Sequence, residues 1–204
     1  MSLEYDYIIA GGGSAGCVLA SRLANKSKDS ICLVEAGGSG KNLFIKMPAG
    51  NGFIFGNPKF DWGYHSVKQA QLNNRKIYFA RGKGLGGTSI VNGMVYIRGV
   101  AQDYDNWRQM GLDGWGYSDL LPYFKYSEGS TNRQNKFHGN QGPLKVEPAR
   151  NFSVLDEAFI KAAVDTGHEF LDDFNANKRA GVSRIDSTTS VSYTHLTLPT
   201  TYTV

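Results

Sequence analysis

Three glycines near the N-terminus constrain what this chain can fold into more than any other feature. Gly11, Gly13 and Gly16 have the spacing G-x-G-x-x-G, directly after the short apolar run Tyr7–Ala10. That run is too short and too β-prone for a helix, so it predicts a fully buried strand of a parallel sheet. Apolar residues between positions 15 and 23 then recur at helical spacing. A strand, a glycine turn and a helix in this order predict a dinucleotide-binding site.

Each of these glycines has its own physical role in such a site. Gly11 permits a tight turn out of the strand, Gly13 lets the backbone approach a pyrophosphate with no Cβ in the way, and Gly16 lets the helix pack close to the strand. Free N–H groups at the start of the helix, with the positive end of its dipole, would hold the phosphates. The alternative is a glycine-rich connection in an α/β domain that binds nothing.

A second apolar run, Ile31–Val34, predicts the next strand and is followed by Glu35. An acidic residue about 20 residues beyond the glycines, at the C-terminal end of a strand, suits the hydroxyls of an adenosine ribose. The segment up to Glu35 therefore predicts a site for an adenine dinucleotide.

Composition excludes several classes of protein. The chain has 204 residues, 41% of them hydrophobic, which is enough for one domain and part of another. Its net charge of +4 is dispersed along the chain, so no nucleic-acid partner is predicted. No transmembrane segment and no signal peptide are predicted. Cys17 and Cys32 are expected to be reduced core residues with no metal site, which favours a cytoplasmic protein.

A second glycine-rich stretch spans residues 81–99. Its glycines at positions 82, 84, 86 and 87 would cost conformational entropy in a helix or strand, which indicates backbone lying flat against a ligand. Thr88 and Ser89 then begin a helical or extended segment whose N–H groups are expected to face outwards.

With these motifs the chain resembles the glucose–methanol–choline (GMC) family of FAD-dependent oxidoreductases, and most of all its choline dehydrogenase-like branch. The resemblance runs from Tyr5 to Ile185, and its most specific part is residues 81–99. It implies an α/β fold: a Rossmann-like FAD-binding domain over residues 1–143 and the start of an α+β substrate domain over 144–190. Residues 191–204 have no counterpart in the family pattern. They are expected to be a non-native, adaptor-derived tail, and the alternative is a divergent natural C-terminus.

By that resemblance the cofactor is FAD. The residues that match its pyrophosphate loop are Gly11, Gly13, Ser14, Ala15 and Gly16. Glu35, with Ala36 beside it, matches the acid that binds the adenosine ribose. Gly82, Gly87 and Thr88 match the loop over the pyrophosphate and ribityl groups, and the segment beside the isoalloxazine ring corresponds to Asn92, Gly93, Met94 and Val95. Val91 stands where some members attach FAD covalently through a histidine, so this FAD is expected to be non-covalent.

The family oxidises a small-molecule alcohol by hydride transfer to the flavin, with a histidine as base. That histidine and its partner belong to a later part of the family's chain, so no catalytic residue is predicted here. His65, His138 and His168 are expected to be structural, and His195 lies in the predicted tail. The alternative function is a catalytically inactive fragment that binds FAD or ADP. An NAD(P)-dependent dehydrogenase is disfavoured by residues 81–99 and by the long segment after Glu35.

The remaining elements are predicted from local patterns. Residues 41–60 are expected to be irregular, with short strands in 61–66 and 75–80 pairing across Asn73-Asn74. A helix is expected over 100–110, followed by one that Ser118 caps and that has Pro122 in its first turn. A strand with one solvent-exposed face is expected around Leu144–Val146, after a polar surface loop over 131–142. Ser153 is expected to cap a last helix that ends at Gly167 and turns inward the apolar residues Leu155, Ala158, Phe159 and Ala162.

Overall fold

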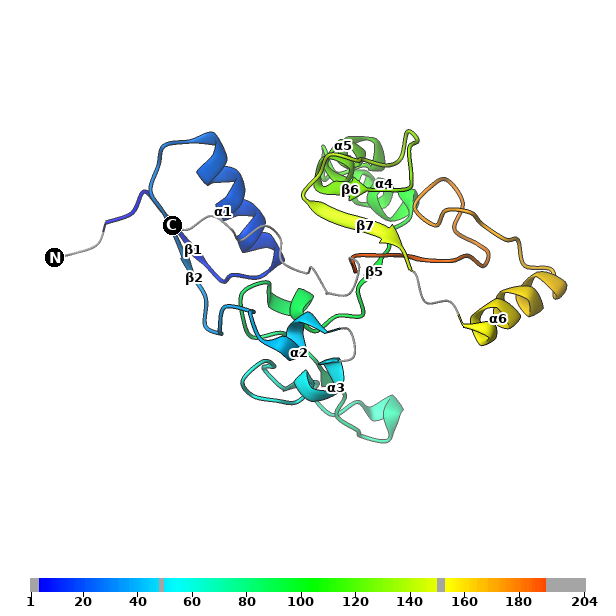
Figure 1. Ribbon diagram of the computed structural model, residues 1–204, viewed down its shortest axis with the longest axis horizontal. Coiled ribbons are helices and arrows are strands. Elements are labelled where there is room, and N and C mark those ends of the chain that lie inside the picture. The colour runs from blue at the N-terminus through cyan, green and yellow to red at the C-terminus, as the bar shows by residue number, and fades with distance from the viewer. Residues whose placement is uncertain (1–3, 48–49, 150–152, 190–204) are drawn as a thin grey trace. The chain divides into compact units, whose positions relative to one another are not determined.

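The computed structural model describes residues 4–47, 50–149 and 153–189 (Figure 1). The chain divides into two compact units: unit 1 extends to Met94, and unit 2 runs from Val95 to Ser190. This division concerns compactness and does not test the domains 1–143 and 144–190, which stay predictions. The predicted tail, with His195, lies outside the described residues.

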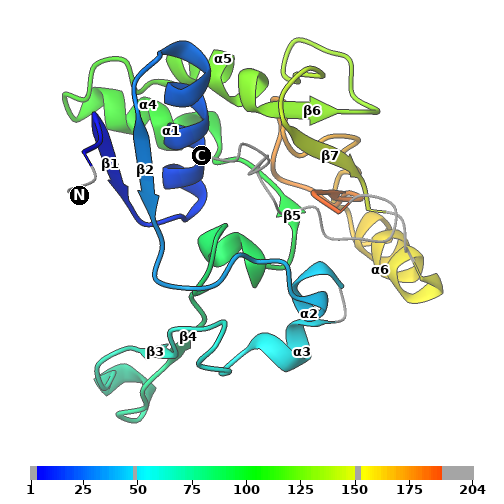
Figure 2. The ribbon, with the colours of Figure 1, turned by 60° about the vertical axis from the view of Figure 1, so that its left-hand side comes forward.

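Unit 1 begins with the predicted strand, helix and strand. Strand β1 (Tyr7–Ala10) leads through the glycine turn into helix α1 (Ser14–Lys26), and strand β2 (Ile31–Val34) follows. The two strands are parallel, with Tyr7 opposite Ile31 and Ala10 opposite Val34. Figure 2 shows α1 lying beside this pair of strands. The prediction from the glycine spacing and the apolar runs is confirmed for all three elements.

The predicted full burial of the first strand is wrong. Ile9 is buried and faces α1, but Ile8, on the opposite face of the strand, is 69% exposed, and Val34 of β2 is 53% exposed. The physical reason is that β1 and β2 form a two-stranded sheet and α1 packs on them from one side only. One face of the sheet is therefore open in the described residues.

The segment expected to be irregular contains two one-turn helices, α2 (Leu43–Lys46) and α3 (Asn51–Ile54). The Asn42 side chain caps α2 by accepting a hydrogen bond from the Phe44 N–H group. The two helices pack against each other and against the 3₁₀ helix η3 (Gly87–Ile90), which begins the segment expected after Thr88. The apolar core of unit 1 lies between them and consists of Ile45, Ile54, Phe60, Ile90 and Val91.

The predicted pair of short strands is present in unit 1. Strand β3 (Tyr64–His65) pairs antiparallel with β4 (Tyr78–Phe79), and the 3₁₀ helix η2 (Ala70–Leu72) lies in the connection. Asn73 and Asn74 both have positive φ, which is the left-handed conformation that a tight turn needs and that asparagine tolerates. The turn prediction is confirmed.

Unit 2 holds a four-stranded sheet with the order β5-β8-β7-β6. Its strands are β5 (Val95–Tyr96), β6 (Glu128–Ser130), β7 (Leu144–Pro148) and β8 (Asp186–Ser187). Strands β6 and β7 are parallel, and β8 is antiparallel to both β7 and β5. Helices α4 (Ala101–Gln109), α5 (Tyr117–Ser127) and α6 (Val154–Asp165) complete this unit. The predicted helix over 100–110 and the strand at Leu144–Val146 are confirmed.

The predicted start of α5 at Ser118 is wrong. The N-cap is Gly116, whose N–H group donates to the carboxylate of Asp119 at 3.1 Å. Because the helix begins at Tyr117, Pro122 lies inside it and beyond the first turn. Asp119, three residues after the N-cap, satisfies the Gly116 N–H group at the N-terminus of the helix. This hydrogen bond outweighs the ordinary preference for serine at the N-cap position.

Helix α6 has the predicted cap but not the predicted burial. Ser153 Oγ accepts from the Asp156 N–H group, and the Asp156 carboxylate accepts from the Ser153 N–H group. The apolar side that was expected to turn inward is open, with Leu155 79% and Phe159 70% exposed. No element of the described residues packs closely over this face. The N-cap and the helix propensity of the residues suffice to form α6, whereas burial of its apolar face requires another element to pack on it.

A buried ionic network, which no local sequence pattern predicted, joins distant segments of unit 2. Glu128 is fully buried and accepts hydrogen bonds from Arg98 Nη2 at 2.6 Å and from His138 Nδ1 at 2.7 Å. His138 Nε2 lies 2.8 Å from the Asp173 carboxylate. Arg133 extends the network, with its Nε 2.6 Å from Asp186. His138 is thus structural, as expected, but it is buried and not part of a solvated surface loop.

His138 is held as an imidazolium by this network. Both ring nitrogens face carboxylate oxygens, and both can donate only when the ring is protonated. Burial alone would lower the pKa of His138, but the hydrogen bonds and negative charges of Asp173 and Glu128 raise it to about 9. The neighbouring Arg98 and Arg133 guanidinium groups balance the remaining charge of Glu128 and of Asp173 and Asp186.

Unit 2 is therefore expected to lose stability in mildly alkaline solution. The pKa of His138 in the folded chain lies above its ordinary value of 6.5, so the stabilisation is fully present below pH 6.5 and is lost as the pH rises through about 9. The loss should amount to about 3 kcal/mol. Urea denaturation at a series of pH values measures it. His138→Gln should flatten this pH dependence, whereas replacing the exposed His65 should not; equal profiles for both variants would contradict the assignment.

Candidate functional site

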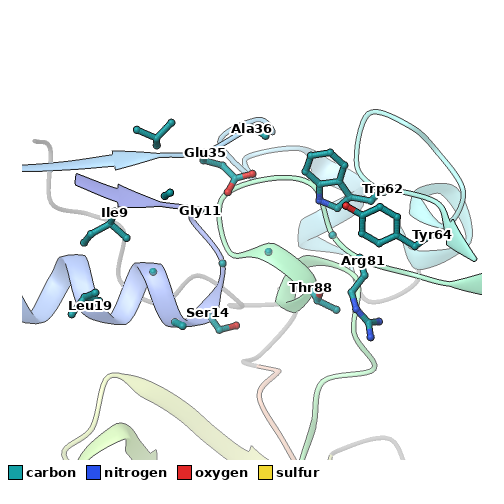
Figure 3. Close-up of a pocket in the computed structure, with 17 residues that line it drawn as sticks. Ile9, Gly11, Ser14, Leu19, Glu35, Ala36, Trp62, Tyr64, Arg81 and Thr88 are labelled. Carbon is teal, nitrogen blue, oxygen red and sulfur yellow. The ribbon is translucent and has the colours of Figure 1, made fainter. Parts of the chain in front are cut away.

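A cavity of about 950 Å³ lies in unit 1 where the glycine turn meets the second glycine-rich stretch (Figure 3). The predicted cofactor residues that line it are Gly11, Gly13, Ser14, Ala15, Gly16, Glu35, Ala36, Gly82, Gly87 and Thr88. Segments separated by about 70 positions in the sequence therefore line the same cavity. The family resemblance assigned both segments to FAD, and both line this one cavity.

The two glycine-rich segments touch through their backbones. The Gly86 N–H group donates to the Gly12 carbonyl at 2.7 Å. A Cβ added at Gly87 would lie 2.7 Å from the Gly13 Cα, and Gly87 has φ +57°, in the left-handed region. A Cβ at Gly82 would lie 2.1 Å from the Gly87 carbonyl oxygen. Only glycine permits such short distances at positions 82 and 87, and the cavity is therefore lined here by backbone atoms.

The first glycine turn is equally tight. Gly11 has φ +100°, and its N–H group donates to the Val34 carbonyl of β2 at 2.7 Å. A Cβ at Gly16 would lie 1.9 Å from the Gly11 carbonyl oxygen, so only glycine lets α1 approach the strand this closely. Gly13 differs, because a Cβ there would have no atom of the chain closer than 3.9 Å. Packing of the chain does not require glycine at position 13. The space that a side chain there would fill is part of the cavity.

Glu35 stands at the end of β2 with its carboxylate tied to backbone N–H groups. One oxygen accepts from Gly12 at 2.7 Å and the other accepts from Gly37 at 2.8 Å. An ionised carboxylate has further acceptor positions on each oxygen, so the group can hold its place and still receive hydroxyl donors. The structure thus gives Glu35 a second task, which is to fix the glycine turn.

Three side chains line the cavity without having been predicted: Trp62, Tyr64 and Arg81. The Trp62 and Tyr64 rings stack at 6.0 Å with an interplanar angle of 9°. Figure 3 shows these two rings and Arg81 across the cavity from Glu35. Gly63 between them has φ +65°, so this segment is not regularly extended and strand alternation would not have found the two rings. Arg81 lines the cavity as an exposed residue, and its Nη1 donates to the Ala80 carbonyl at 2.7 Å.

Asp61 fixes the segment that carries Arg81. Its carboxylate accepts from the Arg81 N–H group at 3.0 Å, from the N–H groups of Gly56 and Gly63, and from the Tyr78 hydroxyl. Burial alone would raise the pKa of Asp61, but these hydrogen bonds hold it at about 2. The carboxylate therefore stays charged at neutral pH and keeps the rim of the cavity in place.

The residues predicted beside the isoalloxazine ring do not line this cavity. Asn92, Gly93 and Met94 follow η3, and Met94 has φ +61°, an uncommon conformation for a residue with a side chain. Val91 is buried in the core of unit 1. Val95 belongs to unit 2. The cofactor roles of these residues stay predictions.

The cavity contains no histidine of the described residues. His65 lies in unit 1 with its Nδ1 3.0 Å from the Gly63 carbonyl, and His138 and His168 belong to unit 2. Cys17 and Cys32 are both free thiols. In the part of the chain that the structure describes, no helix has the length and apolar character needed to cross a bilayer.

The cavity has the features that a dinucleotide requires. Backbone atoms of the glycine-rich segments line the cavity around the start of α1. The first N–H groups of a helix have no partner inside the helix and can bind phosphate oxygens. Glu35 offers acceptors for ribose hydroxyls at the end of β2, and Arg81 offers a positive charge for phosphates. The residues present therefore fit FAD.

Comparison with known proteins decides the family. The family model of GMC oxidoreductases matches residues 5–193. The chain belongs to the GMC oxidoreductase family. The predicted family, the FAD-binding α/β fold and the assignment to a class of enzymes are thereby confirmed, and FAD is the cofactor of this family.

Relatives of known sequence and structure agree with this membership. The chain is 43% identical over 187 residues to an oxygen-dependent choline dehydrogenase of Sinorhizobium fredii, covering 92% of this chain and 34% of that protein. Pyridoxine 4-oxidase from Mesorbium loti is 32% identical with a TM-score of 0.87, over 93% of this chain and 38% of the other. An FAD-dependent oxidoreductase from Chaetomium thermophilum is 32% identical with a TM-score of 0.82, over 92% of this chain and 34% of the other. The chain spans about a third of the length of the curated relatives that it matches.

Proposed function

We propose that this chain is the N-terminal, FAD-binding part of a GMC enzyme that oxidises an alcohol. The observation that carries the proposal is the cavity in which the glycine turn, Glu35 and the Gly82–Thr88 segment meet. Membership of the family supports the same function. FAD, when bound, accepts a hydride from the carbinol carbon of the substrate.

The residues of the chain bind and orient this cofactor. The N–H groups at the start of α1 and the backbone at Gly13 and Gly87 face the pyrophosphate, and Glu35 accepts the hydroxyls of the adenosine ribose. Arg81 balances the phosphate charge. The aliphatic Val91 offers no nucleophile for a covalent bond, so the cofactor is held by non-covalent contacts alone.

The substrate in this proposal is a small-molecule alcohol. Choline is a candidate because the curated relatives are choline dehydrogenases. No histidine of the described residues lines the cavity, so a base for the hydroxyl proton has to come from another part of a longer protein. The chain by itself is then an FAD-binding fragment without turnover, which is the second candidate function, and a cytoplasmic location completes the proposal.

A chimera tests this function. Residues 5–189 would replace the matching segment of the Sinorhizobium fredii relative, and the purified chimera would be mixed with choline without oxygen. We expect loss of the visible flavin absorbance, since this chain supplies the cofactor site and the relative supplies the rest. The isolated chain loaded with FAD is the control and should keep its absorbance. A chimera that binds FAD and stays oxidised with choline and with other alcohols would contradict the proposal.

A further inference from the structure

A second, smaller cavity lies in unit 1, and no residue lines both this cavity and the cofactor cavity. It has a volume of about 270 Å³ and is called here the lysine hollow. Three lysines line it, Lys41, Lys59 and Lys83, and no carboxylate does. Ser39 and Asn42 add polar side chains. A site with three cations and no anion has an electrostatic potential that favours an anionic ligand.

The lysines come from three segments that the backbone holds together. Gly38 and Gly84 form a parallel bridge, in which the Leu85 N–H group donates to the Gly38 carbonyl at 2.8 Å. The Lys83 N–H group donates to the Phe60 carbonyl at 2.8 Å. Phe60 and Ile45 line the hollow as buried members of the core of unit 1. The backbone that carries the three lysines is therefore held together, while the Lys41 and Lys59 side chains are exposed.

The positive charge of the hollow is not neutralised by the chain. Among the described residues, no carboxylate pairs with any of the three lysines. Two of the ammonium groups lie over aromatic rings, that of Lys59 5.5 Å from the centre of Phe60 and that of Lys83 4.9 Å from the centre of Trp62. Such contacts hold a cation in place without cancelling its charge. Because Trp62 lines the cofactor cavity, the hollow depends chiefly on the charges of Lys41 and Lys59.

We propose that the lysine hollow binds the phosphate group of a small ligand, at a site separate from the FAD cavity. Lysine is a compact cation with three N–H donors, which suits the several oxygens and the double negative charge of a phosphate. A carboxylate carries a single charge and gains less from three cations. The volume accommodates inorganic phosphate or the phosphate end of a phosphomonoester.

Inorganic phosphate is the probe that tests this proposal. Its binding to the 204-residue chain would be followed by broadening of the phosphorus NMR signal in a chloride background. In Lys41→Gln/Lys59→Gln we expect binding to weaken by roughly tenfold or more, because two unit charges at the ligand are lost. The control Lys26→Gln/Lys68→Gln removes the same charge from exposed lysines that line neither cavity, and should leave binding unchanged.

Saturation with FAD separates the two cavities. Phosphate binding that persists with FAD bound supports the lysine hollow, and phosphate binding that FAD abolishes assigns the ion to the cofactor cavity and overturns the proposal. Equal weakening in both double variants would mean non-specific attraction and would also overturn it, as would no binding to the unchanged chain. Glycerol 3-phosphate, compared with phosphate and with glycerol, then distinguishes a phosphomonoester from the free ion.

Discussion

Replacing Glu128 by alanine is expected to lower the free energy of unfolding of unit 2 by about 3–5 kcal/mol. The carboxylate is fully buried and accepts hydrogen bonds from Arg98, His138 and the Gly139 N–H group. Its removal leaves the buried Arg98 guanidinium without its carboxylate partner and His138 with Asp173 as its one remaining carboxylate partner. The destabilisation comes from the uncompensated charge of Arg98 more than from the lost contacts themselves.

Glu157→Ala is the matched control for this change. Glu157 also pairs with an arginine, Arg184, at 2.7 Å, but both side chains are about half exposed. The same substitution should therefore cost about 1 kcal/mol or less. Hydrogen exchange of the amides in β6 and β7 measures both variants within unit 2. If Glu128→Ala exchanged no faster than Glu157→Ala, the network would not hold this unit together.

Replacing Gly13 by valine is expected to weaken FAD binding by about a hundredfold or more, which corresponds to about 3 kcal/mol. A side chain at this position meets no atom of the chain within 3.9 Å of its Cβ, and the φ of Gly13 is −73°, which any residue adopts. The added methyl groups would instead occupy the cavity where the pyrophosphate is proposed to lie. The variant should fold and fail to bind.

Gly52→Ala is the matched control for the cofactor site. A Cβ at Gly52 meets nothing within 4 Å, and Gly52 does not line the cavity. It should leave FAD affinity unchanged. Equal affinity of Gly13→Val and of the unchanged chain would remove the glycine turn from the cofactor site.

Local patterns predicted the first part of unit 1 to the residue. The bounds of β1 and β2 follow from apolar runs and the glycines beside them, which act over a few residues, and the presence of α1 follows from helical spacing. Burial was predicted less well, because it depends on elements far away in the sequence. Ile8 and the apolar side of α6 show this, since both have the expected pattern and neither is covered by the described residues.

The cavity lining was predicted at its glycine-rich backbone and at Glu35, whereas Trp62, Tyr64 and Arg81 were not predicted. The conformational cost of glycine indicated that residues 81–99 lie against a ligand, and the family resemblance assigned both glycine-rich segments to FAD. Arg81 and Trp62 enter the cavity because Asp61 fixes their segment through hydrogen bonds to residues up to 20 positions away, which no short pattern reveals. The burial and ion pairs of His138 were not predicted for a related reason: its partners Glu128 and Asp173 lie 10 and 35 residues away.

The most direct measurement of the central claim is a titration of the 204-residue chain with FAD, followed by flavin fluorescence, beside the Gly13→Val variant. We predict saturable binding of FAD to the unchanged chain, competition by ADP, release of all the flavin on acid precipitation, and no saturation of the variant. Binding that both proteins share, flavin that stays attached to the precipitated chain, or preference for NAD over FAD would contradict a non-covalent FAD site built on the glycine turn.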